Sequence, residues 1–295
     1  MLVNRSSLLD LFTALDGAFQ GGLGLAAPDW QRIAMPVRTS AIAQKHPWLK
    51  DIPGMRRWIG DRQVSALAAS SYEIENLEYE GTIEVRVRDL ESDQFGIFTT
   101  QARLMGEAFA AFPNQQVFAA LLAGFSTLCY DGQSFFDTDH PVIAADGTQT
   151  TASNSGGGSG TPWFLLCTGR AVKPLIWQVR KEEPFKQLTP QELIDRNKRI
   201  EYGAYADCAV GFGFWQLGYG SKQPLDASAY AAARAAIGSF KGDYGRPLGL
   251  VPDLLVVPPA LESAARKIVS NSLATGGETN EWAGTAQVLM TSWLA

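Results

Sequence analysis

The residues best suited to chemistry lie close together, between Asp131 and His140. Asp131, Asp137, Asp139 and His140 offer carboxylate and imidazole groups, which bind several divalent metals. One interpretation is a metal-dependent hydrolase that uses Asp137, Asp139 and His140. However, Asp-Gly and His-Pro are frequent turn pairs, and no partner cluster of acidic residues or histidines recurs elsewhere in the sequence. We therefore expect turn residues here and no bound metal.

Nucleophilic catalysis has few candidate bases in this sequence. The two histidines, His46 and His140, each precede a proline and are expected to be loop residues, so a serine or cysteine nucleophile has no evident base. The three cysteines, Cys129, Cys167 and Cys208, are scattered and form no C-x-x-C pair. We predict free thiols and no catalytic residue.

Two glycine-rich segments could be mistaken for cofactor loops. Gly22, Gly24 and Ala27 match a G-x-G-x-x-A pattern, but no strand precedes them and Pro28 interrupts the helix that should follow. The tract 148–161 lacks the Gly-Lys-Ser/Thr ending of a phosphate-binding loop, and its composition predicts a mobile loop. We expect no cofactor.

The composition excludes two further classes of protein. A net charge of -5 and a pI of about 5.2 argue against a protein that coats nucleic acid with a basic face. No apolar run approaches the roughly 18 residues needed to cross a membrane. We expect a protein that contacts neither a membrane nor a specific DNA sequence.

A long helix from 94 to 125 is the element around which the chain is organised. Its apolar residues recur at steps of three and four, which is the helical period. Asp93 precedes it as a candidate N-cap. Pro113 interrupts the run and predicts a kink, or two collinear helices that meet there.

Two segments of opposite charge precede this helix. Residues 45–62 carry five basic and two acidic side chains, whereas 72–93 alternates like a strand pair or one bent strand and carries eight acidic and two basic side chains. They could form a solvated hairpin, or they could meet opposite charges on neighbouring copies. The candidate contact residues between copies are Trp48, Lys50, Arg56, Arg57, Trp58, Arg62, Glu73, Glu75, Glu78 and Glu80.

The remaining chain mixes predicted helices and strands, which indicates the α+β class. An amphipathic helix is predicted within 1–20, followed by a flexible segment at 21–27. Later helices are expected at 189–201 (with a Thr189 capping box), 225–238 and 260–271, and strands at 163–167, 175–179, 209–219, 254–257 and 285–294. Because projecting segments occur without a convincing active site, we expect a building block whose partners are copies of itself.

Several runs resemble motifs of the Mu-like phage major head subunit (gpT) family: 51–62 (DIPGMRRWIGDR), 123–132 (AGFSTLCYDG), 135–141 (FFDTDHP), 210–216 (VGFGFWQ) and 282–286 (WAGTA). The resemblance spans nearly the whole chain. It implies a capsid protein of the HK97-like fold, with an N-terminal arm (1–45), an extended β-hairpin loop (46–82), a peripheral domain with the spine helix (83–222) and an axial domain (223–295). In this assignment the β-rich segment 161–220 completes the peripheral sheet.

The same resemblance implies a function. We expect a major capsid protein that forms hexamers and pentamers of an icosahedral shell around double-stranded DNA, joined by noncovalent contacts. Expected partners are other copies, a portal, and a scaffold, protease or decoration protein. Assembly is expected in the bacterial host cytoplasm, and the product is the virion capsid. A tail or adaptor protein is the structural alternative.

Overall fold

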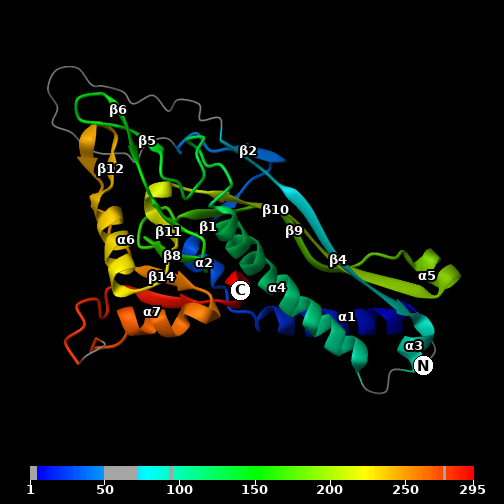
Figure 1. Cartoon of the computed structure of the whole chain (residues 1–295). Coiled ribbons are helices and arrows are strands. Elements are labelled where there is room, and N and C mark those ends of the chain that lie inside the picture. Colours follow the sequence, from blue (N-terminus) through cyan, green and yellow to red (C-terminus); the bar gives the residue numbers. More distant parts are fainter. Residues whose placement is uncertain (1–4, 50–71, 93–95, 275–276) are drawn as a thin grey trace.

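The computed structural model describes residues 5–49, 72–92, 96–274 and 277–295. The molecule is elongated, with helix α4 (Ile97–Ala123) running obliquely between two sheets (Figure 1). A four-stranded sheet extends toward one tip, and a five-stranded sheet forms the broader end. This long helix confirms the central prediction from the sequence.

The four-stranded sheet has the order β1-β9-β10-β4. β1 (Ala34–Arg38) runs parallel to β9 (Leu175–Gln187), whereas β10 (Arg199–Phe212) runs antiparallel to both β9 and β4 (Leu77–Arg86). The long β9 and β10 continue past the body of the molecule to helix α5 (Gln191–Asn197) at the tip (Figure 1).

Two short strands, β2 and β3, form a separate two-stranded sheet. β2 (Ala43–Lys45) pairs antiparallel with β3 (Glu73–Glu75), so Lys45 and Glu73 lie opposite each other. Most of the predicted β-hairpin loop (46–82) lies outside the described residues.

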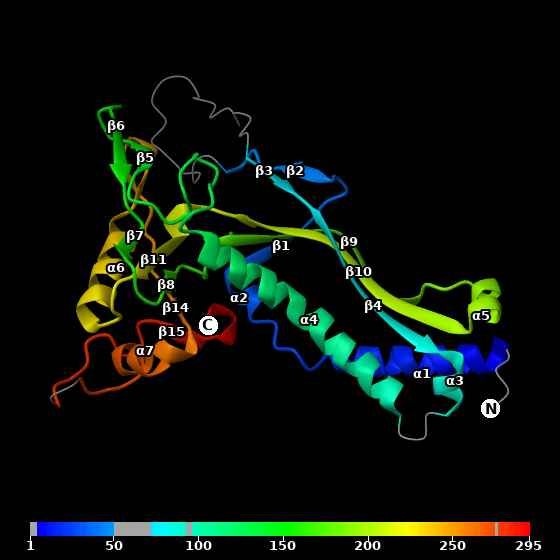
Figure 2. The same ribbon diagram turned by 45° about the vertical axis from the view of Figure 1, so that its right-hand side comes forward.

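Helix α1 (Arg5–Leu23) lies alongside the N-terminal half of α4, as both views show (Figure 2). Glycine permits the close approach, because a Cβ on Gly106 would lie 2.1 Å from the Phe19 carbonyl oxygen and one on Gly22 would lie 2.1 Å from that of Arg103. The predicted flexible segment is therefore partly helical and tightly packed. In its described part, the predicted N-terminal arm lies on the body of its own chain.

The five-stranded sheet has the order β15-β14-β8-β11-β7, and helices α6 (Ala227–Ser239) and α7 (Glu262–Val269) pack on it. Its strands are β7 (Ser155–Gly158), β8 (Trp163–Leu166), β11 (Gly218–Lys222), β14 (Leu254–Val257) and β15 (Gln287–Met290). β8 and β11 thus belong to this sheet, although we expected segment 161–220 to complete the other one. All four residues of β8 are buried, as are all four residues of β14, and the two strands pair in the interior of this sheet. β11 pairs with the other edge of β8.

The smaller elements complete the chain. They are α2 (Trp30–Ile33), α3 (Val87–Glu91), β5 (His140–Ile143), β6 (Gln149–Ala152), a 3-10 turn η1 (Trp215–Leu217), β12 (Lys241–Gly242), η2 (Asp243–Gly245), β13 (Arg246–Pro247), η3 (Pro259–Leu261) and η4 (Ser292–Leu294). Across the described ranges, no helix combines the length and apolar character needed to cross a membrane.

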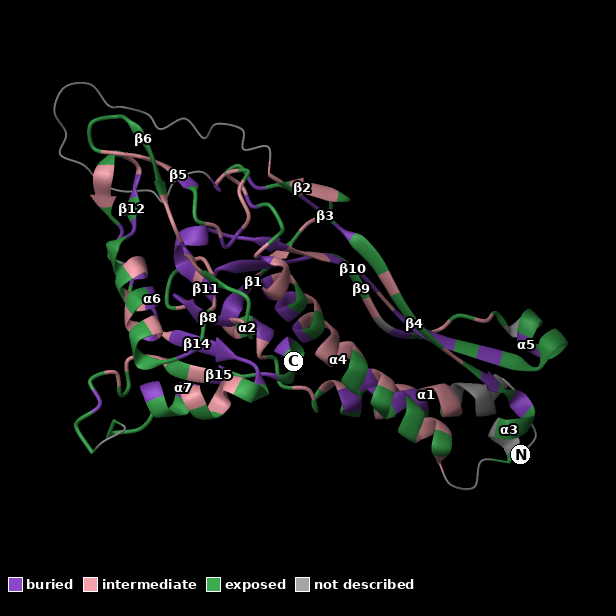
Figure 3. Cartoon of the chain, in the orientation of Figure 1, coloured by how far each residue is buried: buried purple, intermediate pink, exposed green. Residues whose placement is uncertain are grey.

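Two hydrophobic clusters hold the molecule together (Figure 3). The larger surrounds the five-stranded sheet and the C-terminal half of α4, where Phe118 and Leu121 are fully buried. The smaller joins α1, the other half of α4 and the far part of the four-stranded sheet, where Phe19 stacks on Phe185 at 4.8 Å.

Three sequence predictions differ from the structure for identifiable reasons. The predicted strand 72–93 ends at Arg86, because its partner β10 begins at the opposing Arg199, and the chain turns into α3. The helix expected at 189–201 is shorter, because Lys198 adopts a left-handed conformation that ends it. Thr189 makes no helix cap; its hydroxyl accepts a hydrogen bond from the Glu201 amide.

The glycine tract is a further difference, since it forms edge strand β7 and not a mobile loop. A Cβ on Gly158 would lie 2.6 Å from the Lys222 backbone, and one on Gly156 would lie 2.5 Å from the Ser221 hydroxyl. The glycines are therefore needed for β7 to approach β11. Composition alone does not distinguish this role from flexibility.

Candidate subunit-contact surface

The basic half of the predicted contact surface is only partly visible. Lys50, Arg56, Arg57, Trp58 and Arg62 lie outside the described residues. Trp48 is described and packs on its own chain, edge-on to Phe214 with ring centroids 5.8 Å apart. Trp48 thus packs against the body of its own subunit.

The acidic half follows one line along β3 and β4. Glu73 and Glu75 lie on β3, are exposed and have no ionic or hydrogen-bonded partner for their carboxylates among the described residues. Glu78 accepts a hydrogen bond from the Tyr205 hydroxyl at 2.8 Å, and this bond raises the pKa of Tyr205 to about 12. Glu80 accepts one from Thr82 at 2.5 Å. These four residues, which we call the charged strip, therefore follow one another along β3 and β4.

Strand register concentrates like charges next to this strip. Glu78 lies opposite Asp207, and Glu84 lies opposite Glu201. Arg180 neutralises Asp207 with a contact of 2.5 Å. Like charges directly opposite each other destabilise a strand pair, so this register is maintained by other contacts of the sheet. The free edge of β4 carries charge, which opposes uncontrolled strand pairing.

A buried polar network attaches the loop base to the four-stranded sheet. The side chain of Gln178 on β9 is fully buried; its amide nitrogen donates to the Ile74 carbonyl at 3.0 Å and to Asn76 Oδ1 at 2.9 Å, and its oxygen lies 3.0 Å from His46 Nε2. Asn76 in turn donates to two carbonyls of the segment before β2, those of Ala41 and Ile42. Both ends of the predicted loop are thereby fixed.

Sequence analysis missed this network. Gln178 falls within an apolar strand, and its partners lie more than 100 residues away. The only available signal was a polar residue at a position that strand alternation places inside.

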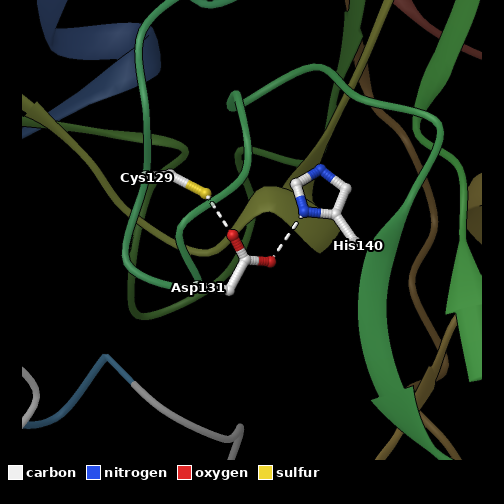
Figure 4. A group of neighbouring side chains, drawn as sticks. All are labelled: Cys129, Asp131 and His140. Carbon is white, nitrogen blue, oxygen red and sulfur yellow. Dashed lines mark hydrogen bonds and ion pairs between the residues drawn. The ribbon is translucent and has the colours of Figure 1, made fainter. Parts of the chain in front are cut away.

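The metal hypothesis concerned a loop that the structure describes in full (Figure 4). Asp131 lies between the other two side chains: one carboxylate oxygen is 2.7 Å from His140 Nδ1, and the other accepts a hydrogen bond from the Cys129 thiol at 3.1 Å. Ligand atoms of these three residues lie within 4.8 Å of one another. The residues brought together are therefore Cys129, Asp131 and His140.

Asp137 and Asp139 play a different part from the one the metal hypothesis gave them. Asp137 accepts hydrogen bonds from the Thr138 and Asp139 amides at 2.6 and 3.2 Å. Asp139 is exposed and accepts one from the Thr138 hydroxyl. Such bonds shape a turn, and the sequence predicted turn residues in this segment.

The Cys129 cluster is poorly suited to nucleophilic chemistry. Burial and the adjacent Asp131 raise the pKa of the Cys129 thiol well above its ordinary value, so the thiolate that attacks or binds metal is disfavoured. Burial alone would raise the pKa of Asp131, but hydrogen bonds from His140, Cys129 and the Gln133 amide outweigh it and lower that pKa. The cluster is a closed hydrogen-bonded unit.

Comparison with known proteins assigns this architecture. A family model described as Mu-like prophage major head subunit gpT matches residues 8–294. The major capsid protein of Escherichia phage Mu is 35% identical over 305 residues, which cover 100% of both chains.

Two solved structures are similar over almost all of the chain. The procapsid of bacteriophage JBD30 gives a TM-score of 0.84 and 37% identity, with 99% of this chain and 100% of that chain covered. The JBD30 capsid decorated with minor capsid protein trimers gives 0.77 and 28%, with 94% of each chain covered.

Proposed function

The chain belongs to the Mu-like prophage major head subunit gpT family, and from this membership we infer that copies of it build the shell of a phage head. It is a major capsid protein with the HK97-like fold. Its relatives are structural head proteins, so the chain is not an enzyme. The hydrolase interpretation is therefore set aside.

We propose that the chain forms hexamers and pentamers of an icosahedral shell around double-stranded DNA, joined by noncovalent contacts. The observation that carries this proposal is the similarity to the JBD30 procapsid chain over nearly the full length. A net negative charge suits a shell that encloses DNA without adhering to it.

The charged strip supports a specific contact between subunits. The basic segment 45–62 of one copy meets the carboxylates of Glu73, Glu75, Glu78 and Glu80 on a neighbour. In support, Glu73 and Glu75 have free carboxylates among the described residues, and complementary charge sets the register of an interface. Trp58 and the half-buried Trp48 add apolar area at the two ends of the basic segment.

The two sheets suggest how the predicted domains divide. Strands β9, β10 and most of β4, with α4, belong to the peripheral domain, on which α1 and β1 of the arm pack, and the five-stranded sheet with α6 and α7 forms the axial domain. This division retains the arm (1–45) and the loop (46–82), but it moves β8 and β11 to the axial side of the predicted boundary at 222.

Partners other than copies of this chain are proposed by analogy. A JBD30 capsid carries trimers of a minor capsid protein, so a decoration protein is a reasonable partner here. A portal and a scaffold or protease are needed to start and mature a closed shell, and assembly takes place in the host cytoplasm.

Electron microscopy of the purified chain tests the proposal. We expect closed shells after the protein is concentrated, with size-exclusion chromatography showing large particles and a smaller precursor. Open rings or tubes would favour the tail or adaptor alternative. A chain that stays monomeric at every concentration, alone and with scaffold and portal, would contradict the proposal.

A further inference from the structure

The two sheets meet at a buried polar centre around His140. His140 begins β5 and is fully buried, Asp131 lies in the loop after the spine helix, and Asn154 lies between β6 and β7. Trp215 belongs to the turn that joins β10 of one sheet to β11 of the other. The centre therefore contacts the turn that leads directly from β10 into the five-stranded sheet.

Asn154 has a fixed orientation. Its Nδ2 atom donates to the carbonyl oxygens of Phe135, Trp215 and Gly218 at 2.8, 3.1 and 3.2 Å. A flipped amide would place its oxygen against those three oxygens. Asn154 Oδ1 is thus an acceptor, as the hydrogen bond that it receives from the Asp137 amide at 2.9 Å also requires.

Both ring nitrogens of His140 face acceptors. Nε2 lies 3.2 Å from Asn154 Oδ1, and Nδ1 lies 2.7 Å from Asp131 Oδ2. A neutral imidazole carries one N–H, whereas the charged form carries two. A neutral ring would leave one of its nitrogens facing an oxygen with no proton between them, unless a protonated Asp131 donates to Nδ1. Its other oxygen already accepts bonds from Gln133 and Cys129, and such bonds favour the ionised carboxylate.

We propose that His140 is a buried imidazolium whose two N–H groups clamp the junction between the two sheets. Its counterion is Asp131, and the indole of Trp215 stacks on the ring with centroids 4.1 Å apart and planes within 6°. An aromatic face at this distance stabilises a cation. The other titratable side chain at the cluster is the Cys129 thiol, which donates to Asp131.

The clamp has a consequence for assembly that rests on the proposed function. One end of the network holds the loop that follows α4, and the other holds the turn that leaves β10. It therefore fixes the orientation of the axial sheet relative to the spine helix. In a closed shell this orientation sets the angle between neighbouring subunits.

Nuclear magnetic resonance measures the protonation state directly. The chain has only two histidines, so ¹⁵N-histidine labelling gives two rings, and the His46→Gln variant assigns them. We expect His140 in assembled shells at pH 7 to show a bonded proton on each ring nitrogen. A single protonated nitrogen would overturn the proposal.

Variants test the clamp separately. His140→Gln and Asp131→Asn should each lower the unfolding temperature by roughly 6 °C or more, because each leaves a buried charge unpaired, and the double variant should lose less than the sum. Asp139→Asn is the control, since Asp139 is exposed and bonds only its neighbour Thr138. Additive losses, or single variants as stable as the control, would overturn the proposal.

Shell morphology separates this inference from the proposed function. We expect Asp139→Asn to form normal shells, and Asp131→Asn and His140→Gln to form aberrant or no shells. Normal shells from both clamp variants would overturn the effect of the clamp on assembly. A wild-type chain that never forms shells would contradict the proposed function, while the two protons on His140 would still be measurable in the unassembled chain.

Discussion

At the scale of single residues, Asn114 shows how one polar side chain positions a whole segment. It follows Pro113 in the spine helix and is buried. Its oxygen accepts a hydrogen bond from the Trp30 amide at 2.8 Å, and its nitrogen donates to the Ala27 carbonyl at 2.7 Å. The segment that leaves α1 is thereby fixed beside Pro113 in the continuous helix α4.

Replacing Asn114 with Ala should destabilise the chain by about 1–3 kcal/mol, because the Trp30 amide loses its partner in a buried setting. Urea unfolding of the unassembled chain measures the change. Gln116→Ala is the matched control on the same helix; it removes one long contact of 3.4 Å with Tyr79 and should change stability by less than about 0.5 kcal/mol. Equal effects of the two variants would contradict the role of Asn114.

The cysteines give a prediction about pH. Burial raises the pKa of Cys167 and Cys208 to about 12 and also raises that of Cys129. The unfolded chain releases these protons near the ordinary value of 9.0, whereas the folded chain retains them. Their contribution to stability is therefore complete below pH 9 and is lost as the pH rises toward 12.

Thiol titration checks this expectation. At pH 8 a disulfide reagent should react with none of the three thiols in the folded chain and with all three in guanidinium, because the cysteines are buried and free. Unfolding midpoints measured from pH 7 to 11 should fall above pH 9. Rapid labelling of the folded chain would show that the thiols are accessible.

At the scale of elements, the contact between α1 and α4 depends on glycine. Gly106→Ala places a methyl group 2.1 Å from the Phe19 carbonyl oxygen, so the two helices must separate. We expect faster proteolysis and hydrogen exchange in α1 and a lower unfolding temperature. Gly17→Ala is the control, since a Cβ there meets nothing within 4 Å and alanine favours a helix by about 1 kcal/mol. An unchanged α1 in Gly106→Ala would refute the close packing.

Elements that bury one face along their own length could be predicted from the sequence. The spine helix and β14 repeat their apolar residues at the periods of a helix and a buried strand, and the structure confirms both. Elements that depend on a distant neighbour could not. β4 ends where its partner β10 begins, and β7 forms because its glycines fit against β11. The local sequence pattern therefore predicts neither the end of β4 nor the presence of β7.

The same distinction holds for the candidate site. The charges of the strip along β3 and β4 are visible in the sequence, although which carboxylates bond within the chain is not. Glu78 and Glu80 accept hydrogen bonds from Tyr205 and Thr82, whereas the carboxylates of Glu73 and Glu75 have no partner within the described part of the chain. His140 was recognised as chemically interesting, but its true partners, Asp131 and Asn154, depend on the loop geometry.

At the scale of the whole molecule, the charged strip makes the assembly proposal testable. Reversing Arg56, Arg57 and Arg62 to Glu should abolish shell formation while the monomer still folds, because the basic segment then repels the carboxylates of a neighbour. Reversing Glu73 and Glu75 to Lys should have the same effect, since both side chains are exposed and have no ionic or hydrogen-bonded partner among the described residues.

The decisive measurement combines the reversal of the three arginines with the reversal of Glu73 and Glu75. Chains with both reversals restore opposite charges across the contact and should recover shells in electron micrographs, with an assembly yield that falls as salt rises. Glu278→Lys with Glu281→Lys is the control, because these exposed acids lie in the loop between α7 and β15, on the other sheet. Direct pairing of the two segments would be refuted if the combined variant failed to assemble although circular dichroism showed that it and both single-set variants were folded. Assembly of the arginine variant alone would show that the basic segment contributes no required contact.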